Sequence, residues 1–395
     1  MVEIYDVIIT GAGPGGATAA YFLGEAGQRV LVLEKETLPR YKACGGGLSA
    51  SMLAEIFPFS FETVIETRVK AIAYAFDRRV ITIPVPNRSA QTVRRDRFDA
   101  HLLAYARAEV GQGTAVRKVT ETADRVIVET VDGDTFVGRY LIGADGANSV
   151  VAHALGLRRD KALAAAIEAE VPASPETLRR FGQALLFIFG DIRQGYAWIF
   201  PKADHLSVGM AALHPKPGQL QAALAQVATC YGLSLAGVRL HGHPIPIYTH
   251  REPIATARVL LVGDAAGLVD PFSGEGIRPA IKSGRLAAEA ILSGQPNRYP
   301  GLIWREIGFS HTFGLGLALL FYNFPRACFL LGAANPYATH AFMDMLADRA
   351  GYPEVILRIF GTLPVFLLAE GLAIVAGLCG GLGWRNRVRT AAYRT

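Results

Sequence analysis

The sequence contains few charged residues and few cysteines for its length. Only 19% of its 395 residues are Asp, Glu, Lys or Arg, whereas 51% are hydrophobic. This composition, together with the lack of an internal repeat, excludes a disordered, collagen-like or coiled-coil chain. The four cysteines, at positions 44, 230, 328 and 379, share no close spacing, so neither a disulfide framework nor a cysteine-based zinc site is indicated. We therefore expect a globular protein of the reducing cytoplasm.

Three further absences exclude other classes of protein. The net charge of +6 is modest and most basic residues are dispersed, so we expect no nucleic-acid partner. The N-terminus has neither the basic flank nor the cleavage site of a signal peptide. The nine histidines lack the regular spacing of metal ligands, so the sequence predicts no metal site.

The first 34 residues predict a strand, a helix and a second strand. Residues 5–10 form a short β-branched run, residues 17–23 are rich in helix formers, and residues 29–33 form another apolar run. Parallel strands joined by a helix in this way are typical of a dinucleotide-binding α/β fold.

A glycine-rich turn with the pattern G-x-G-x-x-G joins the first strand to the helix. Its glycines permit a tight turn and a close approach of the backbone to a pyrophosphate, while the start of the helix supplies amide donors. Glu34, which ends the second strand, is placed to accept hydrogen bonds from ribose hydroxyls. The motif does not distinguish NAD from FAD. Its glycines are Gly11, Gly13, Gly15 and Gly16.

Later segments predict two sheets. Residues 126–137 read as a hairpin, and residues 140–143 and 259–262 read as buried strands. Strand-like runs at 184–189 and 197–200 predict a second sheet, which we expect to cover the reactive end of the cofactor.

Three segments decide between the cofactors. Residues 95–99 open a helical stretch, residues 143–149 close a strand, and residues 262–277 follow another strand. Together with the glycine turn they resemble the flavoprotein monooxygenase superfamily, whose FAD fold is of the p-hydroxybenzoate hydroxylase type. The order and spacing match over residues 3–295. The resemblance implies FAD as the cofactor.

The resemblance also implies individual cofactor contacts. Arg95 would contact FAD from the helix that it starts, and Val119 would lend backbone contacts near the adenine. An alternative is that Arg95 pairs with Asp96 or Asp99 at the surface. The chain departs from the pattern at Ala152, where hydroxylases usually carry an arginine associated with nicotinamide docking.

The segment around residue 264 fits the flavin itself. Asp264 follows a strand and could accept a hydrogen bond from a ribityl hydroxyl. Gly276 and Ile277 begin a predicted helix at 278–292, and backbone N–H groups at that start would meet the pyrimidine edge of the flavin, where negative charge sits in the reduced form.

Two further segments resemble the geranylgeranyl reductase family. These are residues 39–48, which contain Cys44 and Gly45, and residues 195–202, which carry a Y-x-W-x-F-P element. Members of this family saturate isolated double bonds of prenyl chains. Such an alkene has no carbonyl to polarise it, so its reduction combines a proton donor with hydride from the reduced flavin in a dry site.

Cys44 is our candidate for a residue at that dry site. Its thiol could donate a proton or shape the flavin face, with Arg40 and Lys42 favouring the thiolate, and Gly45 would let the backbone lie against the flavin. The alternative is a small, buried, apolar cysteine. Tyr196 and Trp198 face the same side of a strand and could line a prenyl pocket, or could simply belong to a sheet core.

The C-terminal part is densely apolar from residue 302 onward. Its longest uncharged terminal run, residues 371–384, has 14 residues, fewer than the roughly 20 that a membrane span needs. We expect a lipid-facing surface, with a true span and buried core helices as alternatives. The four arginines between positions 385 and 394 favour contact with anionic headgroups.

The sequence thus predicts an α/β fold in which a Rossmann-like FAD-binding domain is interleaved with an antiparallel-sheet substrate domain, followed by an apolar helical region. The FAD domain would comprise 1–60, 92–160 and 255–300, the substrate domain 61–91 and 161–254, and the helical region 301–395. We expect a cytoplasmic enzyme, peripheral on the membrane in the lipid-facing interpretation.

The leading functional hypothesis is an FAD-dependent prenyl reductase. Its substrate would be a prenyl diphosphate, chlorophyll precursor, ether lipid or quinone. The electron donor would be NADPH or reduced ferredoxin. A second G-x-G-x-x-G motif is lacking, so NADPH, if it is the donor, would bind transiently at the flavin, and this absence does not decide between the two donors. The alternatives are an oxygen-using hydroxylase or halogenase, and a flavin-bound cyclase or lipid-binding protein without redox activity.

Overall fold

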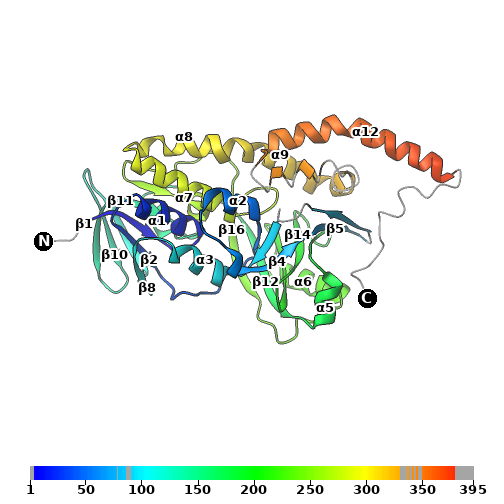
Figure 1. The fold of residues 1–395 in the computed structure, drawn as a ribbon, viewed down its shortest axis with the longest axis horizontal. Helices are drawn as coiled ribbons and strands as arrows, with labels where there is room; N and C mark the ends of the chain where they lie inside the picture. Colours follow the sequence, from blue (N-terminus) through cyan, green and yellow to red (C-terminus); the bar gives the residue numbers. More distant parts are fainter. Residues whose placement is uncertain are drawn as a thin grey trace. The chain divides into compact units, whose positions relative to one another are not determined.

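The computed structural model describes residues 4–77, 79–85, 90–329, 335, 338, 340–341, 344–345 and 349–378. The fold is mixed α/β, which confirms the predicted class (Figure 1). The chain divides into two compact units. Unit 1 takes the described residues up to Lys42 together with Arg95–Leu163 and Pro244–Leu315, and unit 2 takes Ala43–Arg94, Ala164–His243 and the described residues from Gly316 on.

Unit 1 is built on a seven-stranded sheet in the order β8-β2-β1-β11-β10-β9, with β17 paired to β11. The predicted parallel pair β1 and β2 is present, and the predicted hairpin is the antiparallel pair β10 and β11. β1 lies inside this sheet, between β2 and β11. Its β-branched, apolar sequence suits that position, because a strand covered on both faces needs apolar side chains throughout. The strands are β1 (Ile4–Thr10), β2 (Val30–Glu34), β8 (Glu109–Gln112), β9 (Val116–Glu121), β10 (Val126–Thr130), β11 (Thr135–Gly143) and β17 (Val259–Leu261).

Two long helices of unit 1 pack closely together. The first, α1 (Pro14–Glu25), begins in the glycine turn, and the second, α7 (Ile277–Leu292), begins directly after Gly276. A Cβ atom on Gly284 of α7 would collide with the backbone of Gly15, so glycines let the two helices approach. The remaining helical segments are α3 (Arg95–Ala104), α4 (Val150–Ala154), η2 (Gly263–Ala266), η3 (Pro296–Arg298), α8 (Tyr299–Ile303) and η4 (Trp304–Gly308).

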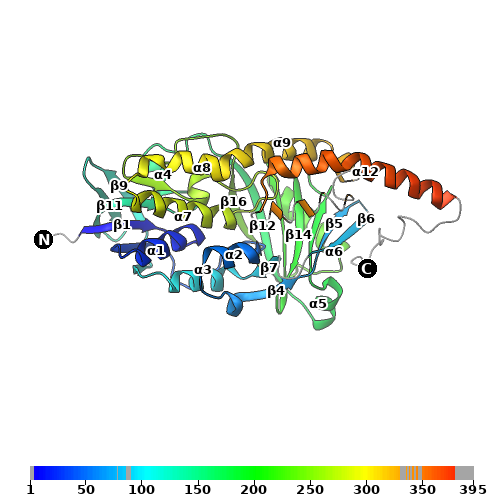
Figure 2. The same cartoon turned by 45° about the horizontal axis from the view of Figure 1, so that its top comes forward.

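Unit 2 is built on a second seven-stranded sheet, in the order β16-β12-β15-β14-β13-β5-β6. One face of this sheet carries small and aliphatic side chains, which form a core with α6 (Gln219–Cys230). The ribbon of Figure 2 shows α6 with the strands of this sheet. The strands are β5 (Ala71–Phe76), β6 (Arg79–Pro84), β12 (Ala162–Pro172), β13 (Ala184–Phe189), β14 (Gly195–Pro201), β15 (His205–Leu213) and β16 (His241–Ile247).

A small three-stranded sheet also belongs to unit 2. Its order is β3-β7-β4, and both outer strands pair antiparallel with β7. It places the segment after Cys44 beside β7. The strands are β3 (Gly47–Ser49), β4 (Ile65–Val69) and β7 (Ala90–Val93), and α2 (Ala50–Ile56) and η1 (Glu62–Val64) lie between β3 and β4 in the sequence. The remaining helix, α5 (Pro175–Phe181), follows β12.

The C-terminal part is helical, as predicted from its composition. It contains α9 (Phe309–Asn323), α10 (Pro325–Cys328) and α12 (Tyr352–Leu378). Among the residues that the structure describes, no helix combines the length and the hydropathy that crossing a bilayer requires. The arginines at 385–394, on which the predicted headgroup contact partly depends, lie outside the described residues.

Candidate functional site

The glycine turn of unit 1 is closely packed against the protein at some of its glycines and has free space beside others. Gly11, Gly13, Gly15 and Gly16 all lie in the turn or the first turn of α1. A Cβ atom on Gly16 would collide with the carbonyl oxygen of Gly11, whereas one on Gly13 would meet nothing closer than Arg40 Nη2 at 3.8 Å. No side chain caps the start of α1, which leaves backbone amides for an anion. The turn therefore fits a dinucleotide pyrophosphate.

Glu34 ends β2 beside this turn and is only 3% exposed. Its Oε2 accepts a hydrogen bond of 2.8 Å from the Ala12 amide, and its Oε1 lies 3.6 Å from Arg40 Nε. The amide of Thr114 donates to the Glu34 carbonyl at 2.8 Å. Glu34 thus holds the glycine turn in place, and its predicted contact with a ribose remains a prediction.

Arg95 forms a buried charge network instead of a surface pair. Its Nε and Nη2 each donate to one oxygen of Asp99 at 2.8 Å, and Arg40 Nη1 lies 3.2 Å from Asp99 Oδ2. Asp99 is fully buried and Arg95 is 6% exposed. The alternative pairing with Asp99 therefore exists, but its expected location at the surface is wrong.

Asp264, Gly276 and Ile277 come together at the start of α7. Asp264 lies in η2, and a Cβ atom on Gly276 would be 3.4 Å from Asp264 Oδ1. Lys42 Nζ is 3.6 Å from Asp264 Oδ2. No side chain caps α7, and Ile277 is buried in its first turn. A carboxylate beside free helix amides provides an acceptor and donors, which is what a flavin ring and its ribityl chain require.

A buried cluster shapes the loop before α7. Asp270 Oδ1 accepts from the amides of Phe272 at 3.0 Å and Ser273 at 2.8 Å. Its Oδ2 lies 3.5 Å from His311 Nε2 and 4.0 Å from Arg278 Nη2. Burial lowers the pKa of His311 to about 4, so this imidazole is neutral at pH 7. We did not predict this cluster, because its members lie up to 41 positions apart in the sequence.

Val119 and Glu34 lie on strands that are not neighbours in the sheet of unit 1. Val119 lies in β9 opposite Val128, and three strands separate β9 from β2. The backbone next to Glu34 is instead that of Gln112 and Thr114. The contact of Val119 with the adenine remains a prediction.

Asp145 holds the start of α4. Its Oδ2 accepts from the amides of Val150 at 2.7 Å and Val151 at 3.2 Å, and burial raises its pKa. Ala152, at the departure from the hydroxylase pattern, is 7% exposed and belongs to the core.

The Cys44 loop, residues 44–46, lies against strand β14 of unit 2. Cys44 is half-buried, and its Sγ accepts from the Gly46 amide at 3.3 Å. A Cβ atom on Gly45 would come within 2.9 Å of the Phe200 ring and 3.2 Å of Trp198 Nε1. The two segments that resemble geranylgeranyl reductases therefore meet in space, although about 150 residues separate them.

The cation that faces the Cys44 loop is Lys202. Its Nζ donates to the carbonyl oxygens of Gly45 at 2.6 Å and Val93 at 2.9 Å. We expected Arg40 and Lys42 to act on the thiol, but both lie in unit 1 and approach carboxylates there. Lys202 is the last residue of the segment 195–202 that resembles geranylgeranyl reductases, but nothing in that segment predicted its contact with the Cys44 loop.

Tyr196 and Trp198 belong to a continuous aromatic face of the unit 2 sheet. Neighbouring rings lie 5.1–6.4 Å apart across β5, β13 and β14, on the side opposite the aliphatic core. Trp198 and Phe200 are 7% exposed, whereas the other five rings are half-buried. Phe321 of α9 packs on Phe189 at 4.9 Å. The aromatic face consists of Tyr74, Phe76, Phe187, Phe189, Tyr196, Trp198 and Phe200.

A buried relay orients Trp198. Its Nε1 donates to Ser207 Oγ at 3.1 Å, and that hydroxyl donates to Glu168 Oε1 at 2.9 Å. Gly209 lies beneath the indole, where any Cβ atom would collide with the ring. The indole of Trp198 is therefore held by a hydrogen bond at Nε1 and by the close approach of Gly209, and its role in lining a prenyl pocket remains a prediction.

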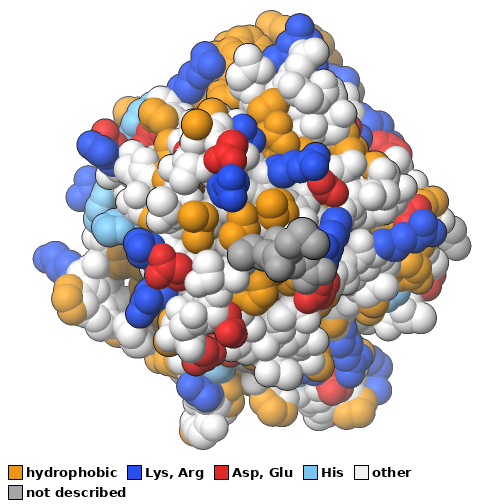
Figure 3. Space-filling view, turned by 90° about the vertical axis from the view of Figure 1, so that its left-hand side faces the viewer, with side chains coloured by type: hydrophobic (Ala, Val, Ile, Leu, Met, Phe, Trp, Pro, Cys, Tyr) orange, Lys and Arg blue, Asp and Glu red, His pale blue; other side chains and the backbone are white. Residues whose placement is uncertain are grey.

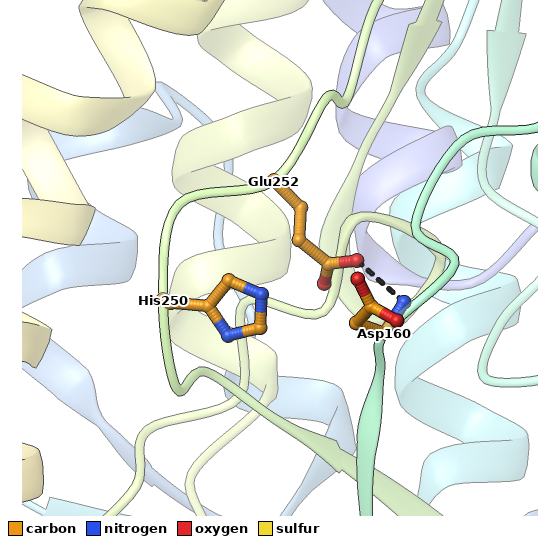
Figure 4. A group of neighbouring side chains, drawn as sticks. All are labelled: Asp160, His250 and Glu252. Carbon is orange, nitrogen blue, oxygen red and sulfur yellow. Dashed lines mark hydrogen bonds between the residues drawn. The ribbon is translucent and has the colours of Figure 1, made fainter.

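One group of side chains has the composition of a metal site. Ligand atoms of Asp160, His250 and Glu252 lie within 4.8 Å of one another (Figure 4). However, Glu252 Oε1 accepts from the Asp160 amide at 2.9 Å, and Oε2 is paired with the buried Arg158. Both carboxylate oxygens are occupied, so we read this group as a clamp between two loops of unit 1.

Comparisons with known proteins agree on the class of enzyme. The family described as FAD dependent oxidoreductase matches residues 6–155. The chain is 32% identical over 315 residues to the chloroplastic geranylgeranyl diphosphate reductase of Oryza sativa subsp. japonica, a match that covers 74% of this chain and 67% of the relative. It is 30% identical over 346 residues to the menaquinone reductase of Mycolicibacterium smegmatis, covering 80% and 84% respectively.

A solved structure is similar over most of the chain. The crystal structure of a geranylgeranyl bacteriochlorophyll reductase-like protein from Thermoplasma acidophilum matches with a TM-score of 0.72 and 26% sequence identity. The match covers 82% of this chain and 88% of that one. It therefore extends beyond the glycine turn and its sheet.

Proposed function

Because the chain belongs to the geranylgeranyl reductase family of FAD-dependent oxidoreductases, we propose that it saturates isolated C=C bonds of a prenyl chain. The observation that carries this proposal is the aromatic face of unit 2, which meets the Cys44 loop at Trp198 and Phe200. A prenyl chain offers no polar group for recognition, so it needs an apolar surface of this kind.

Alkene reduction requires a hydride at one carbon and a proton at the other. FAD supplies the hydride when it is bound and reduced. We assign the proton to the Cys44 thiol, which is half-buried. Tyr196 and Trp198 would hold the chain by contacts with their rings and exclude water from the alkene.

Unit 1 would hold the cofactor. The open position at Gly13 and the uncapped start of α1 suit the pyrophosphate, and Glu34 suits the adenosine ribose. Asp264, Gly276 and Ile277 suit the ribityl chain and the flavin ring. Arg95 would act through its network with Asp99 and Arg40, and Val119 would contribute backbone contacts near the adenine.

The proposal specifies the prenyl chain of the substrate and leaves its polar end open. Its polar end could be a diphosphate, a chlorophyll precursor, an ether lipid or a quinone, and the half-buried rings contact the part that these molecules share. The electron donor would be NADPH or reduced ferredoxin.

We further propose that the C-terminal helices rest on a membrane surface. Along α9 and α12 several large apolar side chains are 47–72% exposed, among them Leu319, Leu320, Leu357 and Phe360. On the face drawn in Figure 3, by contrast, charged side chains of both signs break up the apolar ones. A peripheral contact of this kind would give access to a substrate dissolved in lipid.

A pair of substitutions tests the membrane contact. Leu357→Glu with Phe360→Glu should reduce the fraction of protein that sediments with anionic liposomes at least about threefold, because both charges would enter the lipid interface. Val131→Glu in unit 1, at an apolar residue of 59% exposure, is the matched control and should not change sedimentation. Equal sedimentation of all three proteins would reject the contact.

An anaerobic turnover tests the reductase function. The protein with dithionite-reduced FAD is mixed with geranylgeranyl diphosphate or a geranylgeranylated lipid extract, while flavin absorbance and product mass are followed. Reoxidation of the flavin with a gain of two hydrogens per saturated bond supports the proposal. If the flavin stays reduced until oxygen enters and the product then gains oxygen, the chain is a hydroxylase instead. A product isomerised without flavin oxidation would indicate a cyclase.

A further inference from the structure

Lys202 is a buried cation to which the proposed reductase mechanism assigns no role. It follows the Y-x-W-x-F-P element and is 4% exposed. It directly follows the last residue of β14, and its Nζ reaches Gly45, the same residue that the rings of Trp198 and Phe200 approach. Its two hydrogen bonds join the Cys44 loop to β7, at the carbonyl groups of Gly45 and Val93.

Joining two backbone segments does not by itself require a charge. A neutral donor could bridge two carbonyl groups, whereas burying an ammonium is costly unless the charge is used. Burial lowers the pKa of Lys202 to about 8, so the group stays mostly charged at pH 7 but can lose its proton just above it. A buried lysine of this kind is more typical of an active site than of a structural core.

Several titratable groups face this ammonium from the surrounding elements. They are Cys44 from the loop, Glu66 from β4, and Glu168 and Glu170 from β12, each of which favours the charged form. His205 of β15 accepts the Lys202 amide with its carbonyl, and its ring lies near Glu170. Cys44 has the largest of these charge interactions with Lys202.

We propose that Lys202 is the positioning residue of the Cys44 loop: it fixes the carbonyl groups of Gly45 and Val93 and stabilises the thiolate left when Cys44 gives up its proton. This proposal rests on the proposed reductase function. In the step, the S–H bond of Cys44 breaks and a C–H bond forms at one alkene carbon. Hydride from reduced FAD forms the second C–H bond and leaves FAD oxidised, the electron pair of the S–H bond stays on sulfur, and water later restores the proton.

The test is the pH profile of alkene reduction in three variants. Lys202→Met should lower the rate constant for reduction at pH 7 by at least about tenfold, equivalent to 1.4 kcal/mol in the barrier, with KM changed less than about twofold. In the wild type the rate should show a decline centred near pH 8, where Lys202 loses its charge, and this component should be missing in Lys202→Met, which keeps only the decline that the Cys44 thiol causes when it loses its own proton. Lys202→Arg keeps a charge that does not titrate, so it should retain part of the rate and also lack the component near pH 8.

The matched control is Thr92→Val. Thr92 donates a buried hydrogen bond of 2.9 Å to the Pro201 carbonyl, so its side chain stabilises the same strand end, and its strand partner is Gly47, the residue after the Cys44 loop. Its rate and pH profile should stay those of the wild type. A loss in Thr92→Val as large as that in Lys202→Met would show that Lys202 acts only through folding, and would overturn the proposal. A Lys202→Met variant with the wild-type rate and pH decline would also overturn it.

A second measurement separates this proposal from the reductase function. Hydrogen exchange of the amides at 44–47 should be faster in Lys202→Met than in Thr92→Val, whatever reaction the enzyme performs. If the wild type reduces no prenyl substrate but this difference is found, the reductase function fails and the positioning role stands. If the wild type is active and the exchange rates are equal, Lys202 does not position the loop.

Discussion

The buried arginines of unit 1 and the buried Lys202 of unit 2 are held differently. In unit 1 the guanidinium groups meet carboxylates, as in the pairs Arg95–Asp99, Arg158–Glu252 and Arg278–Glu275. In unit 2 the ammonium of Lys202 meets the carbonyl oxygens of Gly45 and Val93, and Lys282 of unit 1 likewise donates to the Glu306 carbonyl at 3.4 Å, so the difference lies between the two kinds of side chain. A guanidinium held by a carboxylate keeps its charge at any physiological pH, whereas a desolvated ammonium can change it. Under the proposed function, the paired arginines would suit the fixed binding of a charged cofactor, and Lys202 would suit proton chemistry on an uncharged chain.

The largest effect that we expect concerns the cofactor turn. Gly16→Ala should abolish flavin binding, because the new Cβ would collide with the Gly11 carbonyl and displace the turn. Gly13→Ala should leave the apo protein folded, because this position is open, yet weaken flavin binding at least about tenfold, or 1.4 kcal/mol. Flavin absorbance per protein and thermal melting of the apo forms distinguish the two. Equal flavin content in both variants would contradict the assignment of this turn to the pyrophosphate.

The next effect concerns the paired charges. Asp99→Ala should lower the free energy of unfolding by about 3–5 kcal/mol, because it leaves Arg95 buried without its carboxylate. Asp124→Ala removes an exposed partner of Arg125 and should leave the urea midpoint unchanged within error. If both variants unfold at the same urea concentration, buried pairing is not what stabilises unit 1.

The smallest effect concerns the unpaired ammonium. The pKa of Lys202 is about 8 in the folded chain and 10.5 in the reference state, so the unfolded chain binds more protons between these values. Stability should therefore rise with pH across this window by up to about 3 kcal/mol from this group alone. Chemical denaturation of the wild type and Lys202→Met at pH 7.5 and 10.5 should show the rise only in the wild type. A rise of equal size in both proteins would mean that Lys202 titrates normally and that the contrast between the paired arginines and Lys202 is false.

Local patterns predicted the local parts of this molecule. Residues adjacent in the sequence determine the strand, helix and strand around the glycine turn and the hairpin at β10 and β11. The same is true of the strands β13 and β14. The alternation of Tyr196 and Trp198 with small residues indicated one shared face in the same way. The α/β class followed from these segments, whereas FAD followed from the resemblance to a known superfamily.

Contacts between distant segments could not be predicted in this way. Lys202 and Gly45 lie 157 positions apart, and nothing in the spacing of either segment shows that they touch. Arg40 and Lys42 are adjacent to Cys44 in the sequence, which made them the expected cations, but they approach acids of unit 1. Pairing of buried charges depends on tertiary packing, and a single sequence does not contain that information.

The alternation along β14 has an evolutionary consequence. Ala197 and Ile199 belong to the aliphatic core that α6 completes, while Tyr196 and Trp198 belong to the aromatic face. If the aromatic face binds the substrate as proposed, a mutation at Tyr196 would change the shape offered to the substrate while leaving the aliphatic core on the other side of β14 intact. Selection could then alter recognition and the aliphatic core on separate sides of one strand.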